Sequence, residues 1–353
     1  MKTKICVLHE YGAESHYLAL KVLAQKKGCE ISFYTFGKIL NKSIIVKFKY
    51  LIAHPVRAVR DIWFLFTLPF KRSLKIVIGI APYNNNLPLL MKLMTKHDVF
   101  YHTSYSCWDG IRYVHKPNSE RNKEIWREFT NNYVKHIFAV SDWTKKQLIM
   151  NNFAKDDMVS VVNHSYAKII DADAQRKKTL NFVSVAALIP QKGINALLEF
   201  FSKHPEMCIS FVGKGELKSK VLEYARVYSN IDYLGYINGA EKIMPIYKEK
   251  SFLILNSIRT EKWEELFGMV IIEGMSCGCI PITTDHPGPM EIIDNGVDGI
   301  ICKEGEIESG IEMAFKMSDD EYLKMRKAAL RKGRSYHCEL MANRWQEIFT
   351  TEV

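Results

Sequence analysis

The sequence predicts an α/β protein with two doubly wound, Rossmann-like domains that face a common cleft. The chain of 353 residues is too long for one compact hydrophobic core. Short apolar runs alternate with longer amphipathic stretches, which is typical of parallel sheets covered by helices on both faces. The alternation occurs in two series, separated by a polar, unpatterned segment at 167–180 that we interpret as a linker.

The first series, residues 1–166, predicts the N-terminal domain. Its apolar runs have the length of buried strands, and they begin at Lys4, Glu30, Lys75, His97, His136 and Val159. Helical stretches between them are expected at 15–29, 87–96 and 142–153. Gly28 is suited to end the first of these helices, and Ser141 is suited to cap the start of the third.

The second series, residues 181–335, predicts the C-terminal domain. Its strand-like runs begin at Leu180, Cys208, Ile231, Ser251, Cys279 and Asp298. Helices are expected at 194–204, from Leu217 onward, and from near Phe267. The final segment, 336–353, is expected to form a helix that crosses back to the N-terminal domain. In open sheets of this kind, ligands bind outside the carboxyl ends of the strands.

The positive charge of the chain lies in its N-terminal part. The net charge is +10, yet residues 1–100 hold 16 Lys/Arg against 5 Asp/Glu, whereas residues 101–353 hold 33 against 34. Such asymmetry suggests a surface that faces lipid headgroups, nucleic acid or a phosphorylated substrate.

Most of this basic character comes from residues 38–75, which hold nine Lys/Arg and one acid, Asp61. They enclose the apolar run 62–70, which is followed by Lys71, Arg72 and Lys75. The run is far shorter than the roughly 20 residues that span a bilayer. We interpret it as a peripheral membrane element that binds an anionic surface; the alternative is a core helix with solvated charges. Nucleic acid is not expected, because the aromatic residues are contiguous rather than interleaved.

Composition excludes several other classes of protein. A hydrophobic content of 47% with 25% charged residues is typical of a globular chain. Eight cysteines without a CxxC pair indicate reduced thiols rather than disulfides or a zinc site. The charged start predicts no signal peptide. We expect a cytoplasmic protein.

The stretch "EELFGMVIIEGMSCGC", residues 264–279, places Glu265 and Glu273 around an apolar run. A helix that begins near Phe267 and Gly268 would present free backbone N–H groups to an anion. Carboxylates on both sides would accept hydrogen bonds from hydroxyl groups, which suits a nucleotide diphosphate sugar. Taken alone, the pattern also fits two solvated acids around a buried helix.

This stretch, with Ser257 before it and "CGCIP" at its end, resembles the signature of retaining glycosyltransferases of the GT-B fold, in particular glycosyltransferase family 4 (group 1). Further segments resemble that family in the same order along the chain: "YHTS", "FAVSDWTKKQL", "VVNHSY", "LIPQKG", "FVGKGE", "YLGYI" and "HPGPMEIIDNGVDGIIC". The resemblance covers nearly the whole chain.

The resemblance implies roles for three catalytic residues. Glu265 is expected to bind donor-sugar hydroxyls and to face the reacting carbon. Lys192 would place a positive charge on the diphosphate as the sugar–phosphate bond breaks. His102 would bind a sugar hydroxyl near the reaction centre.

It also implies a substrate-binding set. Glu273 would hold the ribose, and the amides of Gly268 and Met269, which follow Phe267, would hold the distal phosphate. Gly12 would let the first loop approach the phosphate closely. The remaining members would border the base, and they are Gly213, Tyr236 and Ile237.

The chain departs from the family pattern at Ala187, where an Arg is usual, so one diphosphate cation is missing. Arg259 is a conceivable substitute. "DAD" at 171–173 looks like a metal motif, but it lies in the linker, and we interpret it as solvated charge. Neither a metal nor a cofactor is expected besides the donor substrate.

The sequence therefore predicts a metal-independent, retaining hexosyltransferase that uses a UDP- or GDP-sugar. The N-terminal domain would hold a glycan or glycolipid acceptor, lipid-linked or of the polysaccharide or lipopolysaccharide type, at the inner face of the plasma membrane. Two alternatives stay open: a UDP-sugar epimerase of the same architecture, and a non-catalytic protein that binds membranes or polyanions and keeps a vestigial pocket.

Overall fold

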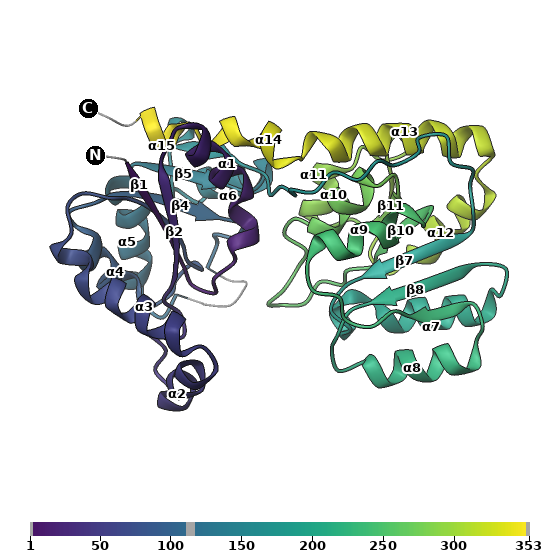
Figure 1. Cartoon of the computed structure of the whole chain (residues 1–353), viewed down its shortest axis with the longest axis horizontal. Coiled ribbons are helices and arrows are strands. Elements are labelled where there is room, and N and C mark those ends of the chain that lie inside the picture. Colours follow the sequence, from purple (N-terminus) through teal and green to yellow (C-terminus); the bar gives the residue numbers. More distant parts are fainter. Residues whose placement is uncertain (1–2, 111–116, 351–353) are drawn as a thin grey trace. The chain divides into compact units, whose positions relative to one another are not determined.

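The structure, a computed structural model, describes residues 3–110 and 117–350. The chain forms two compact units (Figure 1). The N-terminal unit contains residues up to His164 and those from Cys338 onward, and the C-terminal unit contains Ser165–His337. Each unit has one six-stranded parallel sheet, so the predicted α/β fold with two doubly wound sheets is confirmed.

The N-terminal sheet has the strand order β2-β1-β3-β4-β5-β6. Its strands are β1 (Lys4–His9), β2 (Glu30–Thr35), β3 (Lys75–Gly79), β4 (Asp98–Thr103), β5 (His136–Ala139) and β6 (Val159–Val161). Its helices are α1 (Leu18–Lys26), α2 (Ile44–Ala53), α3 (Pro55–Thr67), α4 (Leu87–Met94), α5 (Glu120–Glu128) and α6 (Asp142–Met150). The order of the strands reverses between β1 and β3, which is the position where doubly wound sheets bind ligands.

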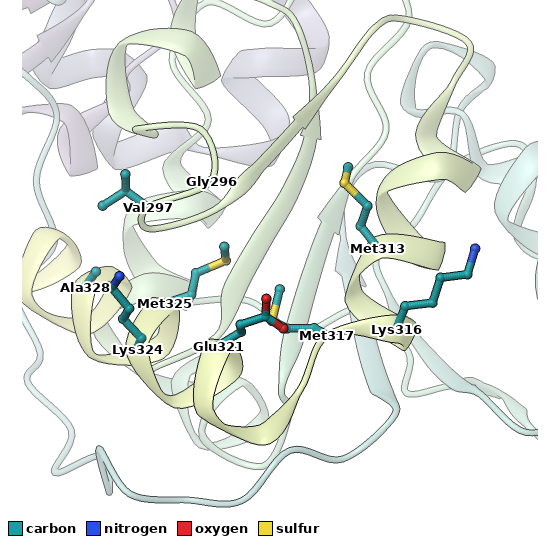
Figure 2. Close-up of a pocket in the computed structure, with 9 residues that line it drawn as sticks. All are labelled: Gly296, Val297, Met313, Lys316, Met317, Glu321, Lys324, Met325 and Ala328. Atoms are coloured by element: carbon teal, nitrogen blue, oxygen red, sulfur yellow. The ribbon is translucent and has the colours of Figure 1, made fainter.

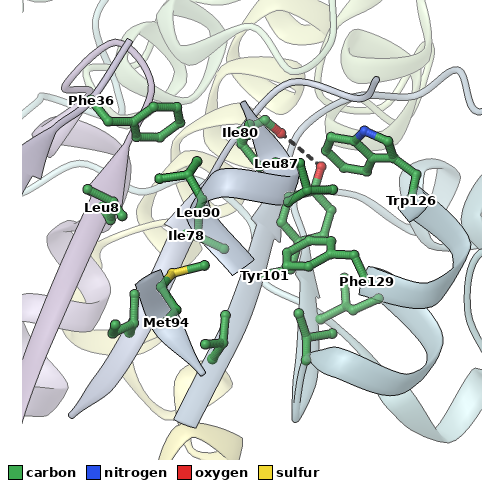
Figure 3. Close-up of a cluster of buried hydrophobic side chains, with 14 of the residues drawn as sticks. Leu8, Phe36, Ile78, Ile80, Leu87, Leu90, Met94, Tyr101, Trp126 and Phe129 are labelled. Carbon is green, nitrogen blue, oxygen red and sulfur yellow. Dashed lines mark hydrogen bonds between the residues drawn. The ribbon is translucent and has the colours of Figure 1, made fainter. Parts of the chain in front are cut away.

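Two apolar clusters enclose this sheet. On one face, side chains of α4 and α5 pack over the strands, and Tyr101 donates a hydrogen bond to the carbonyl of Ile80 at 2.9 Å (Figure 3). On the other face, Val7, Phe100 and Phe138 pack with α1 and with Trp345 from the end of the chain.

The returning segment begins after α13 (Asp319–Ser335) and consists of short helical turns. These turns are α14 (Cys338–Met341), a 3₁₀ turn at Ala342–Trp345 and α15 (Glu347–Thr350). The expected continuous helix at 336–353 is therefore broken, although Met341, Trp345 and Ile348 still face one core. Residues 351–353 lie outside the described part.

The C-terminal sheet has the strand order β12-β11-β10-β7-β8-β9. Its strands are β7 (Asn181–Val185), β8 (Cys208–Val212), β9 (Ile231–Tyr233), β10 (Phe252–Leu255), β11 (Ile280–Thr284) and β12 (Ile300–Cys302). Its other helices are α7 (Ile194–Lys203), α8 (Lys218–Val227), α9 (Ala240–Lys248), α10 (Met269–Ser276), α11 (Pro287–Ile292) and α12 (Ile307–Lys316). Figure 1 shows α7 and α8 on one side of this sheet and α10 and α13 on the other. The order reverses between β7 and β10.

The expected linker at 167–180 has neither helix nor strand and belongs to the C-terminal unit. Buried Arg326 donates hydrogen bonds to the carbonyl of Asp173 at 2.8 and 3.1 Å and another to Gly278. Arg176 donates to the carbonyls of Lys248 and Glu249. The segment is held because a buried guanidinium needs acceptors, which the chain supplies as backbone carbonyls.

The basic stretch forms the helices α2 and α3, with α2 at the lower tip of the N-terminal unit in Figure 1. One face of α3 belongs to the core, with Phe64 and Leu65 buried, whereas α2 buries no residue at all. Lys75 is a buried residue of β3, so it is not part of a basic surface as we expected. None of the helices in the described ranges is long and apolar enough to cross a membrane.

Candidate functional site

In the C-terminal unit, two loops meet at the reversal of strand order. The loop after β7 carries Lys192, and the loop after β10 carries Glu265. Gly193, with a φ of +58°, ends the turn of Lys192, and a Cβ there would lie 2.3 Å from the side chain of Asn256. Asn256 donates to the carbonyl of Gly193 at 3.1 Å, and the N–H of Ile258 donates to the carbonyl of Gln191 at 2.8 Å. These contacts fasten the two loops together.

As a result, Lys192 and Glu265 form an ion pair between Nζ and Oε2. Each side chain is only 14% exposed. The hydroxyl of Ser257 donates to the same carboxylate oxygen at 3.1 Å, and Nζ also lies 4.5 Å from the ring centre of Trp263. The two expected catalytic residues of this unit therefore lie side by side.

The helix expected near Phe267 is confirmed, because α10 begins at Met269. Gly268 precedes it with a φ of +89°, a backbone conformation that side chains disfavour. Phe267 is buried. The amides of Gly268 and Met269 thus stand at the start of the helix, where backbone N–H groups have no intrahelical acceptor.

Glu273 lies on α10 and is 8% exposed. Burial raises the pKa of its carboxyl group to about 7. Among the described residues, none donates a hydrogen bond to this carboxylate. Glu273 follows Val270 by three positions, so the two side chains share one side of the helix.

Val270 lines a cavity of about 330 Å³ outside the ends of β7 and β8. Three expected base-binding residues, Gly213, Tyr236 and Ile237, line this cavity, as does Ala187. Lys214 places its Nζ 4.0 Å from the ring centre of Tyr236. The cavity therefore combines an aromatic face and a cation with small apolar walls.

Arg259 does not line this cavity, so it does not supply the cation that is missing at Ala187. Its guanidinium is bound to Glu304 at 3.1 Å and lies 3.6 Å from both Glu264 and Asp285. Three carboxylates therefore hold the side chain that could have replaced the missing Arg at Ala187.

In the N-terminal unit, His102 is the second-last residue of β4 and is 4% exposed. Its Nδ1 lies 3.1 Å from the hydroxyl of Tyr17, and its Nε2 has no hydrogen-bond partner in the described ranges. Burial lowers the pKa of His102 well below its ordinary value, and His16 and His9 add to this effect. His102, His9 and His16 border a cavity of about 30 Å³, which has room for about one water molecule.

Gly12 lies in the loop after β1 with a φ of +74°. The N–H groups of Tyr11, Gly12 and Ala13 point at Nδ1 of His9, at 3.0, 3.1 and 3.5 Å. Nδ1 of His9 therefore accepts and carries no proton, in agreement with burial lowering the pKa of His9 to about 4. The loop that Gly12 was expected to bring close to the phosphate is thus held by hydrogen bonds to His9.

A cavity of about 650 Å³ lies between α12 and α13, lined by Met313, Met317 and Met325 with Lys316 and Lys324 (Figure 2). It contains none of the expected site residues. Within residues 3–110 and 117–350, no group of three or more His, Cys, Asp or Glu side chains is arranged to hold a metal ion.

Sequence reasoning missed Trp263, Lys214 and His286. Trp263 and Lys214 contact expected site residues, and His286 accepts a hydrogen bond from the N–H of Glu265 at 3.0 Å. Lys214 and His286 lie within the segments "FVGKGE" and "HPGPMEII", so the motifs located them without indicating a role.

Comparison with known proteins agrees with the geometry of the C-terminal unit. Residues 166–335 match the model of the family described as glycosyl transferases group 1. This part of the chain belongs to the group 1 glycosyl transferases.

An uncharacterized glycosyltransferase of Methanocaldococcus jannaschii is 26% identical over 210 residues, which is 59% of this chain and 56% of that protein. The capsular polysaccharide biosynthesis glycosyltransferase CapM of Staphylococcus aureus is 24% identical over 209 residues, 53% of each chain. The chain thus spans about half the length of the curated relatives it matches.

Among solved structures, HepE of Anabaena in complex with UDP has a TM-score of 0.66 at 14% identity, over 100% of both chains. At this identity the likeness concerns the fold, and it confirms the two-domain GT-B architecture of the chain.

Proposed function

We propose that this glycosyltransferase moves a sugar, with retention of configuration and without a metal ion, from a nucleotide diphosphate donor to a glycan or glycolipid acceptor. The observation that carries the proposal is the Lys192–Glu265 ion pair at the reversal of strand order. Glu265 lies in the loop before α10, and Val270 of that helix lines the 330 Å³ cavity. A cation, a carboxylate, free backbone amides and an aromatic-lined cavity are the groups that a nucleotide sugar requires.

Each group has a defined part in this proposal. The base enters the cavity beside Gly213, Tyr236 and Ile237. Glu273 accepts hydrogen bonds from the ribose. The amides of Gly268 and Met269 face the distal phosphate, which the dipole of α10 also stabilises.

In the transfer step, the bond between the sugar carbon and the phosphate oxygen breaks while the acceptor oxygen bonds to that carbon from the same face. The leaving phosphate takes the proton of the acceptor hydroxyl. Lys192 neutralises the negative charge that develops on the phosphate, and Glu265 holds sugar hydroxyls at the reacting carbon. His102 is proposed to bind a sugar hydroxyl, and the loop that contains Gly12 is proposed to approach the phosphate.

The proposed donor is a UDP-sugar or a GDP-sugar, and HepE of Anabaena, which has a similar fold, was solved in complex with UDP. The CapM relative is named for capsular polysaccharide biosynthesis. This supports an acceptor of the lipid-linked, polysaccharide or lipopolysaccharide type, which is assembled at the inner face of the plasma membrane.

Peripheral binding to that membrane is assigned to α2 and α3. Both helices carry exposed large apolar side chains, namely Ile44, Ile45, Phe48, Leu51, Ile52, Val56, Val59, Ile62, Trp63 and Phe66. Phe70, in the 3₁₀ turn that follows α3, is exposed as well. Ile44 is 79% exposed and Trp63 64%. Lys42 and Lys49 are exposed among them. Apolar side chains beside lysines are what an anionic lipid surface binds.

The deciding experiment has two steps. UDP, GDP, ADP and their sugars are first compared by thermal shift, since a ligand that binds only the folded state raises the melting temperature. The stabilising sugar nucleotide is then incubated with extracted acceptor lipids, and the anomeric configuration of the product is read by NMR. Conversion of the donor without an acceptor would indicate an epimerase, and binding without any turnover would indicate a non-catalytic protein.

A further inference from the structure

The turn that begins α11 holds the backbone of Glu265 from both sides. Nδ1 of His286 accepts a hydrogen bond from the N–H of Glu265 at 3.0 Å. The N–H of Gly288 donates to the carbonyl of Glu265 at 3.4 Å. Both backbone polar groups of Glu265 are thus satisfied by residues of one turn.

This turn also touches the loop directly. A Cβ on Gly288 would lie 2.4 Å from the amide nitrogen of Phe267 and 2.6 Å from the carbonyl carbon of Leu266. Real Cβ contacts are not this short, and the atoms in the way belong to the backbone. Gly288 therefore lets the turn and the loop pack backbone against backbone.

The surroundings of His286 fix its protonation. The ring is fully buried, and its Nε2 lies 2.9 Å from the carbonyl of Ser257 and 3.3 Å from a carboxylate oxygen of Glu304. Both neighbours of Nε2 are acceptors, whereas the neighbour of Nδ1 is a donor. Only the neutral ring with its proton on Nε2 satisfies all these contacts.

Ser257 connects this ring to the side chain of Glu265. Its carbonyl accepts from Nε2 of His286, and its hydroxyl donates to the Glu265 carboxylate at 3.1 Å. The backbone and the carboxylate of Glu265 are therefore fixed by one connected network, in which His286 contacts both the loop and Ser257.

We propose that His286, as its Nε2–H tautomer, is a positioning residue that sets the place of Glu265 in the transfer reaction. His286 acts through Glu265 and does not touch the substrate. The proposal rests on the proposed function of Glu265. It predicts that His286 affects the turnover of bound donor rather than the binding of the nucleotide, because the cavity for the base is lined by other residues.

Two substitutions of His286 test the roles of its two ring nitrogens separately. His286→Asn places an amide oxygen near the position of Nδ1 and keeps an acceptor for the N–H of Glu265. His286→Gln reaches toward Ser257 and leaves that N–H without its acceptor. We expect kcat to fall at least about tenfold in His286→Gln and clearly less in His286→Asn, with the KM for the donor within about twofold in both.

Gly288→Ala should lower kcat like His286→Gln, because the added methyl group displaces the loop. Thermal melting and the Kd of UDP show whether each variant is folded. Unchanged kcat in His286→Gln, or equal losses in the Asn and Gln variants, would overturn the proposal.

A measurement on the ligand-free protein tests the tautomer without any assay of activity. Long-range ¹H–¹⁵N spectra of protein labelled at histidine should show His286 with a bare Nδ1 and a protonated Nε2 at neutral pH, and His286→Gln assigns the signal. Amide exchange at Glu265 should be faster in His286→Gln than in the unaltered chain. The opposite tautomer, or unchanged exchange, contradicts the role of His286, whereas an inactive but correctly protonated chain contradicts only the proposed function.

Discussion

Nζ of Lys192 and Oε2 of Glu265 form an ion pair at the point where the strand order of the C-terminal sheet reverses. Lys192 is the cation expected to meet the donor phosphate, and Glu265 is the carboxylate expected to meet the donor sugar. Without substrate, their two charges neutralise each other. A bound donor has to give each of them a new partner.

The pair predicts a non-additive response to substitution. Lys192→Met and Glu265→Gln should each lower transfer by at least about a hundredfold, because each removes a charge from the site. In the unliganded protein each single change leaves the other charge without its partner, so the double variant should be more stable than the sum of the two losses indicates. Transfer assays and urea unfolding of the four proteins measure both effects. Lys203→Met, at the exposed end of α7, is the control, and additive unfolding free energies would contradict the coupling.

Glu273 predicts a dependence of stability on pH. Its pKa is about 7 when folded and near 4.5 when unfolded, so the folded chain retains a proton that the unfolded chain loses between these values. The free energy of unfolding should therefore fall as the pH rises from about 4.5 to 7, by up to about 3 kcal/mol, and then stay level. Glu273→Gln should remove this decline and should be the more stable protein above pH 7. Parallel declines in both proteins would show that another group is responsible.

The same residue predicts the pH dependence of donor binding. The ionised carboxylate is the better acceptor for ribose hydroxyls. The Kd of the nucleotide should therefore decrease as the pH rises through about 7, and this trend should be absent in Glu273→Gln. Calorimetric titration with UDP between about pH 5.5 and about pH 8.5 measures this trend in the Kd. All buffers should have the same ionic strength, on the order of 50 mM, so that electrostatic screening is equal.

The close packing around Gly213 predicts that a larger residue at this position distorts the cavity. A Cβ there would lie 1.8 Å from the carbonyl oxygen of Ala186, which also lines the cavity, so the backbone has to move. Gly213→Ala should weaken UDP binding by at least about tenfold. Gly305→Ala is the matched control, because Gly305 also has a positive φ but an added Cβ there would meet no atom within 4 Å. Equal UDP affinity in the two variants would contradict the assignment of the cavity.

The exposed apolar side chains of α2 predict binding to anionic vesicles. The chain should float with vesicles that contain phosphatidylglycerol, and less with neutral ones, because Lys42 and Lys49 contribute attraction to negative headgroups. Ile45→Asp with Phe48→Asp should abolish flotation. Neither residue is buried, so the melting temperature should not change.

The control for flotation is Val227→Asp, which places the same charge on an exposed apolar site at the end of α8. Flotation of the α2 variant to the same extent as the control would show that α2 does not bind the membrane.

The sequence predicted the two sheets well, because buried parallel strands leave apolar runs that are short and regular. It predicted the start of α10 because Gly268 separates a polar loop from an apolar helix. Lys75 shows where this reasoning fails: a lysine within a basic stretch was counted as surface, yet it occupies a strand between buried residues. Its position depends on register, which composition does not report.

The residues that hold Glu265 in place could not be predicted from the sequence either. Glu265, Ser257 and His286 come from three separate segments, and their contact follows from the packing of α11 against the loop before α10. A histidine followed by the sequence Pro-Gly-Pro does not by itself indicate such a role. Its role becomes visible only when the donors and acceptors around both ring nitrogens are known.

The return of residues 338–350 to the N-terminal unit has a consequence for the order of events during synthesis. Trp345 and Ile348 belong to the same core as Val7 and Phe138. The N-terminal unit therefore lacks part of its interior until the whole of the C-terminal unit, Ser165–His337, has been made. Domains usually fold in the order in which they emerge. Here the N-terminal unit has to wait for residues 338–350 before this apolar face is covered, and until then the face is accessible to chaperones.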